Sequence, residues 1–362
     1  MRTRRTFPAL AFLAAVIAAQ VAVSLLGKTF YLTQLTMAVY YSIVAMGLCL
    51  VMGFAGQVSL GHGAFFALGG YTTAILTTTD ISRYTPAAMA PVLKQLGIAM
   101  ARDDLSGGSM WTVTPGAAFL AALAITLVVA CLIGYPALRL RGHYLAMATL
   151  GFGMIVHKII LGSALAGATD GITGIPEWRW LGGVAISGSS SLRIQNYYIA
   201  CGLTLLFLVM LGNLIQSRVG RALQAIHDRE LAANAMGIDT AAYKLKTFIL
   251  SALMAAVAGV FIAHYTGSIG PSEAGAMKSV RYVALVAAGG MSNVWLVAVV
   301  SIVINYLSLR GFFGSYDHAV FGALLIAIVS LAPEGPLKPA GDLARRLVRR
   351  CLGRKEGKRV AA

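Results

Sequence analysis

Long apolar stretches alternate with short polar links along the whole chain. A helix of about 20 apolar residues crosses the hydrocarbon core of a bilayer, so each stretch of that length predicts a transmembrane helix. We therefore predict an all-α integral membrane protein with about ten transmembrane helices. The expected spans are residues 7–26, 30–52, 61–79, 115–136, 143–163, 196–215, 247–267, 279–291, 294–309 and 318–333.

The overall composition leads to the same prediction. Of the 362 residues, 58% are hydrophobic and 12% are charged, against about 45–50% and about 25% in soluble domains. A soluble single-core enzyme of this length would need far more charge to cover its surface, so that class is excluded. The cysteines are scattered, which predicts neither a disulfide framework nor a zinc site. They are Cys49, Cys131, Cys201 and Cys351.

The chain begins with three arginines, Arg2, Arg4 and Arg5, ahead of its first apolar stretch. A signal peptide opens in the same way. This stretch, however, is longer than a usual signal core, and a second apolar stretch follows almost at once. We therefore expect a retained first span with the N-terminus in the cytoplasm.

Basic residues gather in some links and not in others, which predicts the orientation of the spans. The links at 137–142 and 216–246 carry several lysines and arginines, whereas the charges of loops 80–114 and 164–195 cancel. We therefore expect the two basic links and both termini in the cytoplasm, and the two balanced loops outside. Ten crossings are consistent with that arrangement.

The basic residues beyond the last span form a separate segment. We expect one polytopic transmembrane domain over residues 1–337 and a basic cytoplasmic tail over 338–362. The formal net charge is +16, which in a soluble protein would suggest nucleic acid, but no aromatic residue interleaves the charges of the tail. A basic segment directly after a span fits the positive-inside rule, and anionic lipid attracts it. We expect contact with membrane lipid and no nucleic-acid partner.

Six glycines fall between Gly53 and Gly70. Each glycine inside a helix costs about 1 kcal/mol relative to alanine, so this density predicts a broken helix or very close packing of helices. Transporters place their sites at broken helices because the exposed helix ends carry partial charges. The candidate residues for a translocation path at this break are Gly53, Gly56, Gln57, Ser59, Gly61, His62 and Gly63.

The alternative for the same glycines is a packing ridge of small residues spaced four apart. One such ridge contains Ser59, Gly63 and Ala67, and another contains Ala255, Gly259 and Ala263. Both interpretations stay open, and both can be true together. A second interruption at residues 289–293 is a mild sign of internal duplication.

The link at 216–246 has the pattern of two short amphipathic helices. The first covers Arg221 to Glu230 and the second Leu231 to Met236, with Gly237 in the usual position for ending a helix. A compact helix with a small-residue face fits a groove on another protein. The alternative is a solvated connector stabilised by its own charges.

Three stretches of this chain resemble the inner-membrane permeases of branched-chain amino-acid ABC transporters, of the LivM type in the LivH/LivM permease family. They are residues 53–65, 138–152 and 220–243, and two shorter stretches, 170–176 and 332–336, also resemble these permeases. The resemblance implies a permease domain over 1–337 in the bacterial inner membrane. It also implies that the link at 216–246 is the coupling loop that docks on an ATPase. The implied coupling residues are Arg221, Glu230, Leu231, Ala232, Ala233 and Gly237.

The same resemblance implies partners. These are two ABC ATPase subunits, a second permease of the LivH type and a periplasmic substrate-binding protein. Residues 22–29 superficially resemble a phosphate-binding loop, but Ala22 stands where that motif needs glycine. ATP hydrolysis is therefore expected on the separate ATPase subunits, and this chain is expected to be a transport subunit without a cofactor rather than an enzyme.

Other functions remain as alternatives. A urea or short-chain amide importer uses a similar permease, and a lone secondary carrier would need an ion-coupling charge inside the membrane. The pattern offers no pair of carboxylates within the predicted spans, no Ser/His/Asp arrangement and no spacing of metal ligands. Ionisable groups at membrane depth are functional candidates by default. Among them, His62 is expected to make a gating or helix-breaking contact, whereas Lys158 and His264 are expected near the interface.

Overall fold

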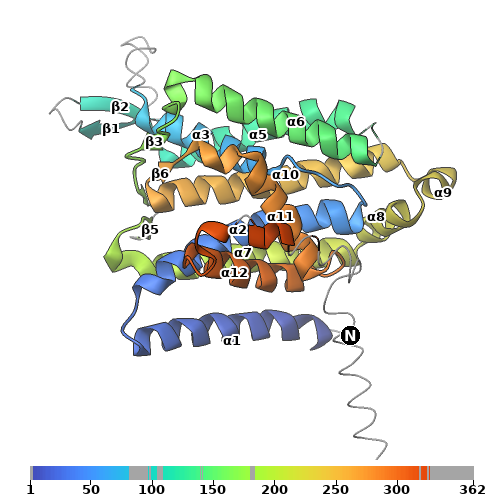
Figure 1. Ribbon diagram of the computed structural model, residues 1–362, viewed down its shortest axis with the longest axis horizontal. Helices are drawn as coiled ribbons and strands as arrows, with labels where there is room; N and C mark the ends of the chain where they lie inside the picture. Colours follow the sequence, from blue (N-terminus) through green and yellow to red (C-terminus); the bar gives the residue numbers. More distant parts are fainter. Residues whose placement is uncertain are drawn as a thin grey trace, which may run out of the picture.

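Most of the described residues lie in helices that run side by side along one direction (Figure 1). Helices α8 (Arg218–Asp228) and α9 (Glu230–Ala235) lie at one end of this bundle, where α1 (Thr3–Leu25) also begins. Strands β1 (Ala99–Asp103) and β2 (Ser109–Val113) form a hairpin at the opposite end. We name these the α8–α9 end and the hairpin end. The computed structural model describes residues 3–80, 97, 99–103, 109–138, 140, 142–179, 184–317, 319–323 and 326.

The long helices follow the apolar stretches of the sequence. Five described helices are long and apolar enough to cross a membrane, and they are Phe30–Phe54, Pro115–Ala137, His143–Gly162, Ser190–Gln216 and Thr240–Thr266. The helices beyond those already named are α2 (Phe30–Cys49), α3 (His62–Thr78), α5 (Pro115–Ala137), α6 (His143–Gly162), α7 (Arg193–Gln216), α10 (Thr240–Thr266), α11 (Ala276–Gly289) and α12 (Val294–Leu309).

The predicted spans at 7–26, 61–79, 279–291 and 294–309 are also helical, as α1, α3, α11 and α12. Most of the tenth, at 318–333, lies outside the described residues, as do the basic tail and Cys351. The number of crossings therefore stays a prediction, while a mostly helical membrane protein is confirmed.

Two helices form the centre of the bundle. In the most apolar part of the span Phe30–Phe54, which contains α2, 89% of the residues are buried. In the most apolar part of α10, 72% of the residues are buried. The corresponding values are 22% for α5, 33% for α6 and 28% for α7. Helices as apolar as these three, with most of their side chains uncovered, are suited to contact with lipid. We therefore assign α5, α6 and α7 to the periphery.

Glycines allow α3 and α10 to pack backbone against backbone. A Cβ placed on Gly69 would overlap the Ala256 carbonyl oxygen, and a Cβ placed on Gly259 would overlap that of Phe66. Small residues at a helix crossing permit this close approach in membrane proteins. Close packing is therefore present at Gly259 of the predicted α10 ridge, whereas on α3 it involves Gly69, and Gly63 of the predicted ridge faces Ser279 of α11.

The substitution Gly259→Val is expected to lower the thermal stability of the protein, because the new side chain has to push the Phe66 backbone away. Overpacking of this kind costs about 1–3 kcal/mol. Thermal unfolding of the purified protein in detergent measures the effect. Gly202→Val on α7 is the matched control, because a Cβ there meets nothing within 4 Å. Equal shifts in both variants would contradict the packing account.

The all-α prediction is wrong for the loops. Besides the β1–β2 hairpin, β3 (Ile172–Thr173) pairs with β6 (Ser268–Ile269), and β4 (Trp178–Arg179) pairs with β5 (Ala185–Ile186), all antiparallel. These strands are short and lie among polar residues, so they leave little periodic signal in the sequence. The β3–β6 pair joins the loop at 164–195 to the chain that follows α10.

Candidate transport pathway and coupling surface

A helix break lies inside the bundle between α2 and α3. Helix α2 continues into a π-helical turn over Leu50–Phe54, residues 55–61 are not helical, and α3 begins at His62. The His62 Nε2 atom lies 2.6 Å from the Ser251 hydroxyl oxygen, and Ser251 stands near the middle of α10. The glycine-rich stretch therefore breaks the helix, as predicted, and α3 starts about half-way along the bundle.

Polar side chains from two further helices, α6 and α11, hold the broken segment. The Leu60 N–H donates to the Thr149 hydroxyl of α6 at 2.9 Å, and the Gly63 N–H donates to the Ser279 hydroxyl of α11 at 3.2 Å. These contacts satisfy two backbone N–H groups at the break, and non-helical backbone at membrane depth needs such partners. The side-chain amide of Gln57 is buried and has no hydrogen-bond partner.

His62 is a structural contact of the break. Its side chain is fully buried, its Nδ1 atom lies 3.2 Å from the Ser59 hydroxyl, and its Nε2 atom faces Ser251. Its ring also packs edge-on against Phe65 and Phe248. The side chain therefore joins the start of α3 to α10, and the expected gating or helix-breaking role stays a prediction.

The two glycine interruptions touch each other. A Cβ placed on Gly53 would overlap the Met291 carbonyl oxygen, and the Cys49 thiol donates to that same oxygen at 3.3 Å. Between α11 and α12, Gly290 has a φ of +78°. The Asn293 side chain caps α12 by accepting hydrogen bonds from the Trp295 and Leu296 N–H groups. The break after α2 and the break between α11 and α12 therefore form one junction.

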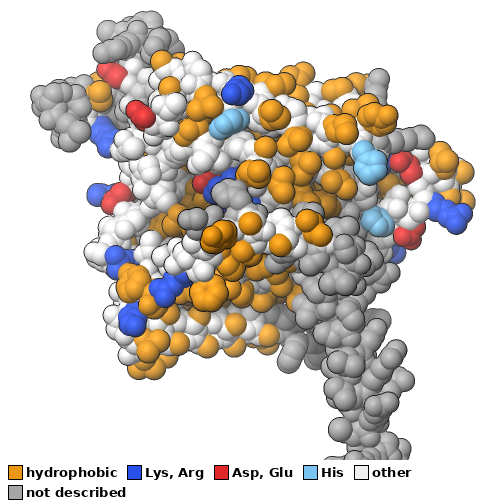
Figure 2. Space-filling view, in the orientation of Figure 1, with side chains coloured by type: hydrophobic (Ala, Val, Ile, Leu, Met, Phe, Trp, Pro, Cys, Tyr) orange, Lys and Arg blue, Asp and Glu red, His pale blue; other side chains and the backbone are white. Residues whose placement is uncertain are grey.

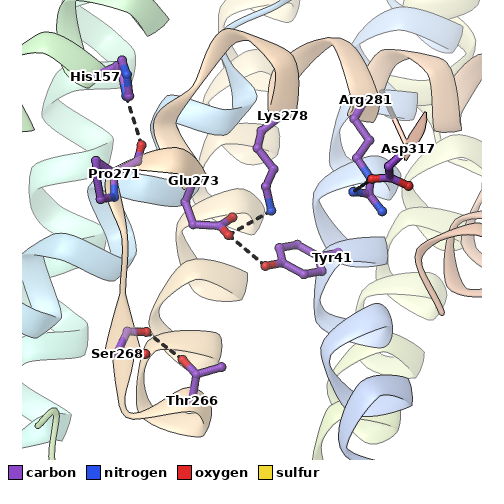
Figure 3. Close-up of polar contacts among 9 residues, drawn as sticks. All are labelled: Tyr41, His157, Thr266, Ser268, Pro271, Glu273, Lys278, Arg281 and Asp317. Carbon is purple, nitrogen blue, oxygen red and sulfur yellow. Dashed lines mark hydrogen bonds and ion pairs between the residues drawn. The ribbon is translucent and has the colours of Figure 1, made fainter. Parts of the chain in front are cut away.

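After α10 the chain turns back into the bundle instead of forming an external link. A 3-10 turn over Pro271–Ala274 precedes α11, and the Glu273 carboxylate accepts hydrogen bonds from the Tyr41 hydroxyl at 3.1 Å and from Lys278 Nζ at 2.9 Å (Figure 3). Tyr41 stands near the middle of the span Phe30–Phe54. The predicted spans left residues 268–278 in a link, so the sequence did not indicate that Glu273 packs against the middle of this span.

A second ion pair lies beside the first. Arg281 Nη1 is 3.2 Å from the Asp317 carboxylate, and the guanidinium lies 4.3 Å from the centre of the Phe321 ring (Figure 3). Sequence reasoning missed all four charged residues, although the spacing of Lys278 and Arg281 puts both on one face of α11. That spacing was the signal available in the sequence.

The link at 216–246 forms the two predicted short helices, α8 and α9. The turn into α8 needs glycine at Gly220, because a Cβ there would overlap the Ile215 carbonyl oxygen. Leu223 and Ile226 are buried against the bundle, whereas Arg221 is exposed. Gly237 follows α9 with a φ of +82°, and the Ile238 N–H donates to the Ala233 carbonyl, which confirms the predicted helix end.

Helix α9 presents apolar side chains at the tip of the α8–α9 end. Leu231 is 70% exposed and Met236 is 83% exposed, whereas Ala233 is buried. Ala232 is also exposed. Glu230 pairs with Lys244 of α10 at 2.6 Å, so α9 is joined to the long central helix. Exposed apolar side chains beside a rigid connection are typical of a docking surface.

Helix α8 also contacts the helix break. A Cβ placed on Gly56 would lie 2.9 Å from Nδ1 of His227, the penultimate residue of α8. Gly56 has a φ of +66°, which favours glycine at that position. The stretches 53–65, 138–152 and 220–243 therefore meet at one place, through Gly56 with His227 and Leu60 with Thr149.

Comparison with known proteins places this arrangement in a family. Residues 30–329 match the family of the branched-chain amino acid transport system permease component. The chain belongs to this family. Over 83% of its length it is 30% identical to the high-affinity branched-chain amino acid transport system permease protein LivM of Salmonella typhimurium, of which it covers 68%. No solved structure matches the chain.

This permease is also similar to other members. It is 24% identical to the permease protein LivH of Salmonella typhimurium, over 83% of this chain and 92% of that protein. It is 25% identical to the permease protein BraD of Pseudomonas aeruginosa, over 85% of this chain and 95% of that protein. One chain thus resembles both LivM and LivH proteins.

The other polar candidates of this permease make structural contacts. The His157 Nδ1 atom lies 3.0 Å from the Pro271 carbonyl oxygen, and His264 lies between the Thr73 hydroxyl and the Pro176 carbonyl oxygen. Both histidines therefore position the chain, His157 at the segment after α10 and His264 at the loop over 164–195. Among the residues that the structure describes, no group of three or more His, Cys, Asp or Glu is placed to hold a metal ion.

Proposed function

We propose that this chain is the permease subunit of an ABC importer that moves branched-chain amino acids across the bacterial inner membrane into the cytoplasm. The names of its LivM and BraD relatives support the substrate class. The observation that carries the mechanism is the contact between the coupling loop and the helix break at Gly56 and His227. The permease itself performs no ATP hydrolysis in this proposal.

The two ATPase subunits drive the permease through α8 and α9. When the ATPase pair closes on ATP, it pushes on the exposed tip at Leu231. Because Glu230 is paired with Lys244, that force reaches α10. Because His227 lies against Gly56, it also reaches residues 55–61. The bundle then rocks between inward and outward openings around the broken helices, as discontinuous helices permit in other transporters.

The orientation follows from the same assignment. The ATPases act from the cytoplasm, so the α8–α9 end faces the cytoplasm, and so does the beginning of α1, which lies at that end in Figure 1. The proposal keeps ten crossings, which return the C-terminus and its basic tail to the cytoplasm. The hairpin end, with its three small sheets, then faces the periplasm and receives the substrate-binding protein.

A second permease of the LivH type completes the channel. Similarity of this chain to both LivM and LivH proteins supports a pair of related subunits, because related folds can pack around a shared pseudo-twofold axis. The urea and short-chain amide alternative loses support, because the relatives compared above are permeases of branched-chain amino acids. A lone secondary carrier would need a charge at membrane depth, and Glu273 meets that one requirement.

Affinity purification tests this function. The tagged protein is solubilised in mild detergent, and the proteins that copurify are identified by mass spectrometry. The importer assignment predicts a pair of ATPases and a second permease. Purification of this chain alone from membranes that contain those subunits would contradict it.

A further inference from the structure

The two ion pairs made by Lys278 and Arg281 of α11 form a mixed-charge cluster, Glu273, Lys278, Arg281 and Asp317, with Tyr41 of α2 beside it (Figure 3). We propose that this cluster is a transient binding site for a zwitterionic α-amino acid on its way across the membrane. The inference rests on the function proposed above and adds the place where the charged part of the substrate is recognised.

The cluster is accessible although it lies at depth. The side chains of Glu273, Lys278, Arg281 and Asp317 retain 16%, 26%, 17% and 24% of their exposure. Figure 2 shows acidic and basic side chains together near the middle of one face, flanked by hydrophobic side chains. Charges at membrane depth face a bundle interior or a water-filled cavity and mark substrate pathways.

Several polar atoms of the cluster have no partner. Within the described residues, the buried side-chain atoms Glu273 Oε2, Arg281 Nε and Asp317 Oδ1 make no hydrogen bond. Tyr282, the next residue on α11, is 1% exposed, and its hydroxyl is also unpartnered. Each buried unsatisfied group costs about 1–3 kcal/mol, and native proteins contain few of them. Such a concentration at one place points to a ligand that supplies the missing partners.

The chemistry of the cluster matches both charges of an amino acid. The substrate carboxylate accepts hydrogen bonds from Lys278 and Arg281, which share one face of α11, and the substrate ammonium donates to Glu273. The Tyr41 ring lies 4.7 Å from the Lys278 ammonium, so it is placed to attract a cation. Without substrate, each ion pair neutralises itself, which limits the cost of holding four charges at depth. Exchange of partners then admits and releases the zwitterion.

Photo-crosslinking of the complete importer complex in lipid nanodiscs tests binding directly. The probe is photo-leucine, with the substrate-binding protein left out so that only membrane-embedded sites react. We expect label within residues 268–281, with leucine protecting at concentrations about tenfold lower than 4-methylpentanoic acid or 3-methylbutylamine, each of which lacks one charged group. No label there, or equal protection by all three compounds, would overturn the site.

A charge exchange separates recognition from a merely structural ion pair. Lys278→Met is expected to lower ATP-dependent leucine uptake about tenfold or more. The double variant Glu273→Lys with Lys278→Glu restores the ion pair but reverses the substrate's orientation, so uptake should stay low. Recovery of uptake in the double variant would show a structural pair and overturn the proposal.

The control is Lys158→Met on α6, which removes an exposed lysine away from the cluster and should leave uptake unchanged. Copurification of the ATPases reports assembly in each variant. If the wild-type complex itself shows no ATP-driven leucine uptake, the proposed function fails. If the wild type transports leucine and Lys278→Met matches it, only the site fails.

Discussion

Leu231→Asp is expected to abolish ATP-dependent uptake while the protein still inserts and folds. The side chain is 70% exposed at the tip of α9, so a carboxylate there disturbs no packing inside the bundle. It does place an unpaired charge in the contact with the ATPase. Loss of a central interface residue costs about 2–4 kcal/mol, which weakens binding by about 30-fold to 1,000-fold. The measurements are uptake and the amount of ATPase that copurifies.

Gln224→Asp is the matched control for this variant. Gln224 is exposed on α8, in the same link but away from α9. It should keep both uptake and the ATPases. Normal uptake in Leu231→Asp would remove α9 from the coupling surface. Loss of uptake in both variants would show that any new charge on this link is harmful and that the tip of α9 has no specific role in coupling.

Gly53→Val is also expected to lower ATP-dependent uptake strongly, for a different reason. Even a Cβ on Gly53 overlaps the Met291 carbonyl oxygen, so valine forces apart the two breaks that form one junction. Helices α2, α11 and α12 then cannot keep the relative positions that they have around the junction. We expect a loss of uptake of about tenfold or more, because small displacements at a working site have effects of that order. ATP-dependent uptake in proteoliposomes is the measurement.

The control for Gly53→Val is Gly151→Val on α6, where a Cβ meets nothing within 4 Å. Because valine at Gly53 can also prevent folding, the milder Gly53→Ala and the thermal stability of all three variants are measured alongside. A variant at Gly53 that folds, assembles with the ATPases and transports at the wild-type rate would contradict the junction.

The sequence was sufficient for features that depend on local chemistry. Six glycines in a short stretch predicted a broken helix or close helix packing, and the chain shows both, with the break between Phe54 and His62 and close packing at Gly69 of α3. Gly237 ends α9 because the backbone there has a positive φ. Apolar stretches of span length became helices for the same local reason.

Features that depend on distant contacts could not be predicted. Residues 268–275 look like an ordinary polar link, yet the chain turns inward because Glu273 bonds Tyr41, 232 positions earlier. His62 was expected to make a gating or helix-breaking contact, but its partner Ser251, 189 positions away, could not be identified from the sequence. The identity of such partners is set by the tertiary fold, which periodicity does not describe.

Leucine uptake into proteoliposomes tests the central claim most directly. The complete complex is reconstituted with its substrate-binding protein outside and either ATP with magnesium or ADP inside. The proposed importer predicts uptake with ATP, none with ADP, and no change when ionophores collapse the proton and sodium gradients. Uptake by this chain alone that needs no ATP and disappears with an ion gradient would contradict the account and identify a secondary carrier.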